Sequence, residues 1–173
     1  MRRIVFAFVA LCSVLMAGAA RPQTKFAWGA DAGASIDLSG SDMSSVDFSA
    51  VFGMSRGWIN FLGVGAEADI VVSSSSRSYP LFVNFKTNFR NTPSLLFWDL
   101  KAGLSLNYME HGPQQTGFYG STGLGVNLAR SSKFCSHLVI AYTFRQRSAV
   151  EGAEMTHDFK SLSYASVKIG VTF

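Results

Sequence analysis

The sequence predicts an all-β fold, an eight-stranded antiparallel up-and-down transmembrane β-barrel, and three observations support this prediction. Apolar residues recur at every second position through eight segments, and no segment shows a convincing helical spacing. Apolar residues make up 48% of the chain, yet they form no long continuous run after residue 20. Glycines and charges of both signs share the row opposite the apolar one. Strands with two such different faces separate two different environments.

Residues 1–20 are predicted to be a secretory signal peptide. Two arginines precede an apolar run from Ile4, and small residues at 17–19 stand where a signal peptidase would cut. An uncleaved membrane helix is one alternative, because the run approaches a spanning length. A lipoprotein signal centred on Cys12 is another. We expect residues 21–173 to form a single outer-membrane β-barrel domain.

The charge and cysteine content exclude several classes of function. Two of the 15 Lys and Arg residues lie in the predicted signal, which leaves 13 basic against 11 acidic residues. A nearly neutral chain gives no reason to expect a nucleic-acid partner. Cys12 would leave with the signal and Cys135 would remain alone, so neither an intrachain disulfide nor a cysteine metal site is expected. No cofactor is expected.

Each predicted strand is an alternating apolar row bounded by polar turns or loops. In chain order, the rows run from Phe26 to Leu38, Val46 to Met54, Trp58 to Val72, Tyr79 to Phe89, Leu96 to Tyr108, Phe118 to Leu128, Phe134 to Phe144, and from about Ser161 to Phe173. Compact turns are expected after the second, fourth and sixth strands, and mostly longer polar loops after the others. Short turns at one rim and long loops at the other are typical of bacterial outer-membrane barrels.

Alternation alone does not say which row faces outward, and a soluble barrel such as a lipocalin would turn its apolar row inward. Strand glycines lie almost entirely on the polar row, Gly120 being the exception. Glycine weakens a water-exposed strand but fits the crowded interior of a narrow barrel. Charges on that row would then form a paired internal network. The predicted lumen network comprises Asp31, Asp37, Asp47, Glu67, Asp69, Lys86, Arg90, Asp99, Lys101, His137, Arg145 and Lys168.

Aromatic residues gather at both ends of the apolar rows, with aliphatic residues between them. Two aromatic girdles around an aliphatic band are what the two interfaces of a bilayer favour, and a soluble core has no reason to sort rings to its ends. The apolar rows are therefore predicted to face lipid. The predicted girdle residues are Phe26, Trp28, Phe52, Trp58, Phe89, Trp98, Phe134 and Phe173 near the turns, and Tyr79, Tyr108, Phe118 and Tyr142 near the loops.

The C-terminal segment VKIGVTF, with alternating apolar residues and a terminal Phe173, resembles the assembly signal of outer-membrane proteins. The chain from Lys25 to Phe173, with segments such as VGAEADIVV and GFYGSTGLGVNL, resembles the small eight-stranded barrels of the OmpA/OmpX type. This resemblance implies a bacterial outer-membrane location, periplasmic termini and four external loops. It also implies three partners: outer-membrane lipid, the barrel-assembly machinery acting on the last strand, and an extracellular ligand for the loops.

A structural or surface-interaction role without enzymatic activity is the function we expect, and two alternatives remain open. A lipid-modifying enzyme of the deacylase or acyltransferase type would need a nucleophile beside a histidine, but Val139 stands two residues after His137, where the resemblance to deacylases would require a serine. Loop residues offer a second catalytic or metal-binding set, namely Glu110, His111, Glu151, Glu154, His157 and Asp158. A narrow ion channel is the other alternative, although the lumen of eight strands is filled by side chains. We assign no catalytic, cofactor-binding or metal-ligating residue.

Overall fold

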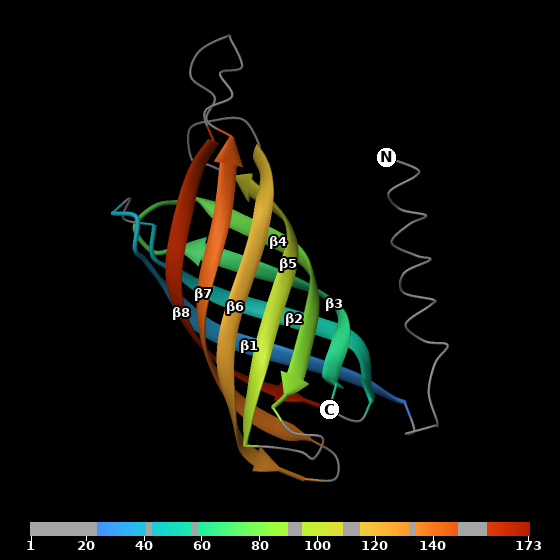
Figure 1. Ribbon diagram of the computed structural model, residues 1–173. Helices are drawn as coiled ribbons and strands as arrows, with labels where there is room; N and C mark the ends of the chain where they lie inside the picture. The colour runs from blue at the N-terminus through green and yellow to red at the C-terminus, as the bar shows by residue number, and fades with distance from the viewer. Residues whose placement is uncertain are drawn as a thin grey trace, which may run out of the picture.

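The computed structural model describes residues 24–40, 43–56, 59–89, 95–108, 115–131, 134–148 and 159–173. These residues form one closed antiparallel barrel in which each strand pairs with the next and the last pairs with the first (Figure 1). The predicted fold class is therefore confirmed. The strands are β1 (Lys25–Asp37), β2 (Ser45–Arg56), β3 (Ile59–Val71), β4 (Arg77–Asn88), β5 (Leu96–Tyr108), β6 (Gln115–Arg130), β7 (Cys135–Ser148) and β8 (Phe159–Thr172).

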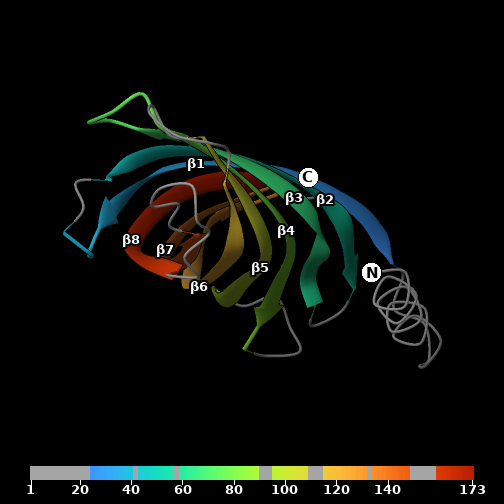
Figure 2. The same ribbon diagram turned by 90° about the horizontal axis from the view of Figure 1, so that it is seen from above.

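The barrel closes where β1 meets β8, in a register that runs from the Gly29–Thr172 pair to the Asp37–Tyr164 pair. Phe173 extends this ladder, because its N–H donates to the carbonyl of Trp28 at 2.7 Å and its carbonyl accepts from the N–H of Trp28 at 3.1 Å. The strands run obliquely around a single interior (Figures 1 and 2). Among the described residues, no helix has the length and apolar character needed to cross a membrane.

The two rows of each strand face opposite environments, as the pleat of an extended chain requires. In β2, Ser45, Asp47 and Ser49 are buried, whereas Val46 and Phe48 are exposed. In β8, Val167 and Ile169 face outward while Lys168 between them is buried. The prediction that the polar rows point inward is therefore confirmed. Polar side chains are buried and apolar ones exposed, which is the reverse of the arrangement in a soluble domain.

The strand connections differ between the two rims less sharply than the sequence suggested. One rim holds the connections at 57–58, 89–95 and 131–134 together with the C-terminal end of β8, and the other holds 38–44, 72–76, 109–114 and 149–158. The connection at 89–95 has more residues than the one at 72–76, and the turn expected after the fourth strand, at Asn91–Pro93, lies outside the described residues. β4 ends at Asn88 and β5 begins at Leu96, and the ladder between them stops at the Asn88–Phe97 pair.

Small inward residues make room for large ones inside the barrel. Gly125 pairs with Phe97, whose ring lies where a side chain at Gly125 would stand. Gly53 and Gly63 also pair across β2 and β3, and a Cβ at either position would overlap the backbone of the other strand. The interior is therefore packed with side chains at this level, as expected for eight strands.

Candidate functional site in the barrel interior

The structure brings most of the predicted lumen residues into one buried region. Ten of the predicted residues are at most 6% exposed: Asp31, Asp47, Glu67, Asp69, Lys86, Asp99, Lys101, His137, Arg145 and Lys168. They come from seven strands, since only β6 contributes none of them. Arg90 lies outside the described residues.

Asp37, the twelfth predicted lumen residue, contacts the loop that follows β1. It is the last residue of β1 and is only half-buried. Its carboxylate accepts from the backbone N–H groups of Ser39 at 2.7 Å and Met43 at 3.3 Å. The alternating register extends to Asp37, and at the strand end the side chain meets loop amides. Asp37 thus organises the connection to β2.

Glu67 on β3 lies at the centre of the network. Its Oε1 accepts a hydrogen bond from Lys168 Nζ at 2.6 Å and another from the Tyr119 hydroxyl at 3.4 Å. Lys101 Nζ lies 3.6 Å from Oε2, and Arg145 Nη2 lies 3.8 Å from Oε1. Three cations from three other strands therefore share one buried carboxylate, which ties opposite sides of the barrel together.

A second set of contacts involves Asp69 and Asp47, and the same Arg145 nitrogen takes part in it. Arg145 Nη2 lies 2.7 Å from Asp69 Oδ2, although the direction of the N–H group does not meet hydrogen-bond geometry. Lys168 Nζ also lies 3.6 Å from Asp47 Oδ2. Asp47 accepts hydrogen bonds from Ser35 and from Ser45, the latter at 2.7 Å. Acids and bases thus alternate through this part of the interior.

Asp31 on β1 forms the third centre, nearer the rim where β1 begins. His137 Nε2 lies 2.8 Å from Asp31 Oδ1, and Lys86 Nζ lies 3.9 Å from the same atom. Lys101 Nζ lies 3.8 Å from Oδ2 and so connects this centre to Glu67. Lys86 Nζ also lies 3.1 Å from His137 Nε2. Lys86 and Asp31 therefore both meet the same imidazole nitrogen.

Asp47, Glu67 and Asp69 are close enough to hold a metal ion, because one carboxylate oxygen of each lies within 4.8 Å of the others. The same oxygens are already contacted by ammonium and guanidinium groups, since Lys168 reaches the first two and Arg145 reaches the last two. Two fixed positive charges therefore lie where a divalent cation would have to bind. The donor set fits an ion-pair network better than a metal centre.

The histidine considered as a catalytic residue lies within this network. His137 is 3% exposed, and its ring packs edge-on against Phe97 with the centroids 5.7 Å apart. Val139, where a deacylase-like pattern would need a nucleophile, is buried on the same face. The loop set considered for catalysis or metal binding, Glu110, His111, Glu151, Glu154, His157 and Asp158, lies outside the described residues.

The sequence analysis missed the aromatic residues of the interior. Tyr119 and Tyr164 are fully buried on either side of Arg145, whose guanidinium carbon lies 5.7 and 4.8 Å from their ring centroids. Lys101 Nζ lies 4.9 Å from the ring centroid of Phe82. Such cation–π contacts stabilise buried cations in place of water. Their signal was available in the sequence, because these rings occupy the same register as the charged residues.

The predicted girdle residues lie on the outer surface wherever the structure describes them, and Trp58 falls outside the described residues. Trp28 and Phe173 stack with ring centroids 4.5 Å apart, and Phe134 lies 6.4 Å from Phe173. At the other rim, Tyr79 and Tyr108 meet edge to face at 5.7 Å. The exposed residues are Phe26, Trp28, Phe52, Phe89, Trp98, Phe134, Phe173, Tyr79, Tyr108, Phe118 and Tyr142.

Comparison with known proteins supports the fold. No family model matches this chain, and no curated protein matches it in sequence. Among solved structures, the N-terminal β-barrel domain of Pseudomonas aeruginosa OprF matches with a TM-score of 0.54 and 14% sequence identity. The match covers 87% of this chain and 100% of that domain. At this identity the similarity establishes a shared fold.

Proposed function

From the fold shared with the OprF barrel domain and from the charged interior, we propose that this chain is a bacterial outer-membrane barrel. Its role is structural or interactive: the barrel anchors the chain in the membrane and holds loops that contact partners outside the cell. The proposal assigns no catalytic step to the interior. Residues 1–20 would direct export, and the last strand would be recognised by the barrel-assembly machinery.

One observation carries the proposal, namely the inverted distribution of polar and apolar side chains. Large apolar residues such as Phe48, Val64 and Ile140 are more than half exposed, whereas Glu67 and Lys168 are buried. Monomeric soluble proteins rarely expose apolar patches larger than a few hundred Å². An apolar surface of this kind around a closed barrel is stable when lipid is the surrounding solvent.

The packed interior supports a structural role over transport. Phe61, Phe97, Tyr119 and Tyr164 each have at most 1% of their surface exposed. Cations lie over the rings of Phe97, Tyr119 and Tyr164. Rings of this size fill the cross-section that a diffusing solute would need. Contact with partners is therefore assigned to the loops, which are the part of such folds that varies most freely.

Location and fold can be tested together. We expect the protein expressed with residues 1–20 to fractionate with outer membranes and to migrate faster on a detergent gel before boiling than after it. Protease added to intact cells is expected to cut in the 149–158 connection and to leave the strands uncut. A folded, monodisperse protein in buffer without detergent would contradict the proposal.

A channel would be detected in the same preparation. We expect the refolded protein to leave planar lipid bilayers at baseline conductance, because the described interior is filled with side chains. Regular single-channel steps from pure protein would instead favour the narrow-channel alternative.

A further inference from the structure

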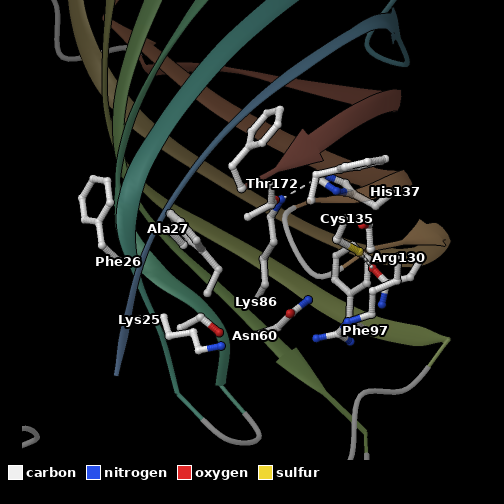
Figure 3. Close-up of a pocket in the computed structure, with 16 residues that line it drawn as sticks. Lys25, Phe26, Ala27, Asn60, Lys86, Phe97, Arg130, Cys135, His137 and Thr172 are labelled. Carbon is white, nitrogen blue, oxygen red and sulfur yellow. Dashed lines mark hydrogen bonds between the residues drawn. The ribbon is translucent and has the colours of Figure 1, made fainter. Parts of the chain in front are cut away.

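A cavity of about 180 Å³ opens at the rim where β1 begins and β8 ends. Among its lining residues, Lys86, Phe97 and His137 are buried (Figure 3). Phe61 is buried as well, whereas Phe134 is an exposed lining residue. We call the buried residues the floor of the cavity and the exposed ones its mouth. A single water occupies about 30 Å³ of liquid volume, so the cavity has room for a small ligand group with several waters.

The ionisable side chains that line this cavity are basic, apart from the Cys135 thiol. Lys25 and Arg130 are exposed at the mouth, on β1 and β6, while Lys86 and His137 lie on the floor, on β4 and β7. No Asp or Glu side chain is among the described lining residues, and Asp31 lies behind the Lys86–His137 pair. Lys25, Lys86 and Arg130 therefore direct positive charge from three strands toward one space, which attracts an anion.

The floor of the cavity contains a hydrogen-bonding conflict that an anion would resolve. His137 Nε2 lies 3.1 Å from Lys86 Nζ and 2.8 Å from Asp31 Oδ1. One nitrogen either accepts from Lys86 or donates to Asp31, but it does not do both. Within the described residues, His137 Nε2 is also the one hydrogen-bond partner of Lys86 Nζ, which carries three protons. An acceptor in the cavity would satisfy Lys86 and leave the imidazole N–H to Asp31.

We propose that this cavity binds a phosphate group, held by Lys86 on the floor, beside the His137 ring, and by Lys25 and Arg130 at the mouth. Phosphate offers several acceptor oxygens and carries negative charge, which matches convergent ammonium and guanidinium donors. Neutral donors also line the space, among them Asn60 and Thr172. The phosphate belongs either to a lipid headgroup, whose chains would lie against Phe26 and Phe134 at the mouth, or to a free phosphate.

The test is a titration of the protein refolded in a neutral detergent, which does not depend on where the protein resides in the cell. Inorganic phosphate and a short-chain phosphatidylglycerol are the two probes, and binding is measured by calorimetry at low ionic strength. Binding of either probe supports the site: binding of the lipid alone, or much tighter than inorganic phosphate, indicates a lipid headgroup, and equal binding of the two or binding of inorganic phosphate alone indicates free phosphate. If neither probe binds, the proposal is overturned.

A double variant, Lys25→Gln with Arg130→Gln, tests the placement of the site. Both side chains are exposed, so folding is expected to persist and is checked by heat-modifiable gel migration. We expect affinity to fall at least ten-fold. Arg77→Gln is the matched control, because Arg77 is an exposed cation at the opposite rim, and its affinity should equal that of the parent. Equal affinity in the double variant, or an equal loss in the control, would overturn the proposal.

Discussion

Neutralising Glu67 is the most direct test of the interior network. The variant Glu67→Gln keeps the shape of the side chain but removes the charge that three cations share. Its hydrogen bond from Lys168, at 2.6 Å, is charge-assisted and contributes about 1.5–3 kcal/mol. Lys101 and Arg145, at 3.6 and 3.8 Å, lose a partner as well. Removing one member of a buried ion pair costs about 3–5 kcal/mol when the other is left unpaired.

The expected loss lies at the lower end of that range, because every cation around Glu67 keeps a second acid. Lys101 retains Asp31 at 3.8 Å, and Lys168 retains Asp47 at 3.6 Å. We therefore expect Glu67→Gln to reduce the free energy of unfolding by about 3 kcal/mol. Urea titration of protein refolded in lipid vesicles, followed by tryptophan fluorescence and by gel migration, measures this change.

Asp37→Asn is the matched control for this experiment, since it makes the same chemical change at a half-buried carboxylate that accepts from loop amides. Its cost should not exceed about 1 kcal/mol, the value of an ordinary hydrogen bond. Adding Lys168→Met to Glu67→Gln should cost less than the sum of the two single changes, because the pair is coupled. A Glu67→Gln protein within about 0.5 kcal/mol of the parent would refute the reasoning, as changes that small are typical of ordinary surface substitutions.

Three further outcomes follow from the structure. Lys86→Met should destabilise the fold by about 2–4 kcal/mol in urea titrations without opening a conductance in planar bilayers; raised conductance at unchanged stability would contradict a filled interior. Gly125→Ala should lower the free energy of unfolding by about 1–3 kcal/mol, because the added methyl group meets the Phe97 ring. Gly120→Ala is its control and should change the unfolding midpoint little, because its methyl group meets only the exposed Phe118 ring. Equal effects of the two changes would contradict the packing. Phe173→Ala, which removes a stacked ring, should cost about 1 kcal/mol or more in vesicles, and an unshifted midpoint would argue against the closing pair.

The strands and their two faces were predictable because alternation is a local property. Side chains of an extended chain point to opposite sides with a period of two, so the residues flanking Lys168 had to point away from it. Alternation alone could not show which of the two rows faces the interior. The glycines on the polar row indicated that this row points inward, because a residue such as Gly125 leaves space for a large ring such as that of Phe97.

The pairing of charges was not predictable from the same pattern. Glu67 and Lys168 are about a hundred positions apart, and they meet only because β8 closes on β1 in a particular register. The hydrogen bonds from loop amides to Asp37 were not predictable for a related reason, because alternation does not reveal where a strand ends. The rim cavity likewise depends on how far β1, β4, β6 and β7 extend past one another.

The amino-acid sequence alone therefore determined that this chain forms strands and that each strand has one apolar and one polar face. It also determined that aromatic side chains lie at both ends of the apolar rows. These properties depend on neighbours within a few residues. The tertiary structure alone decided which acid meets which base, that Arg145 lies between two tyrosines, and that four basic side chains surround one cavity. Those contacts join distant strands, and barrel closure with its stagger is what brings distant strands to the same level.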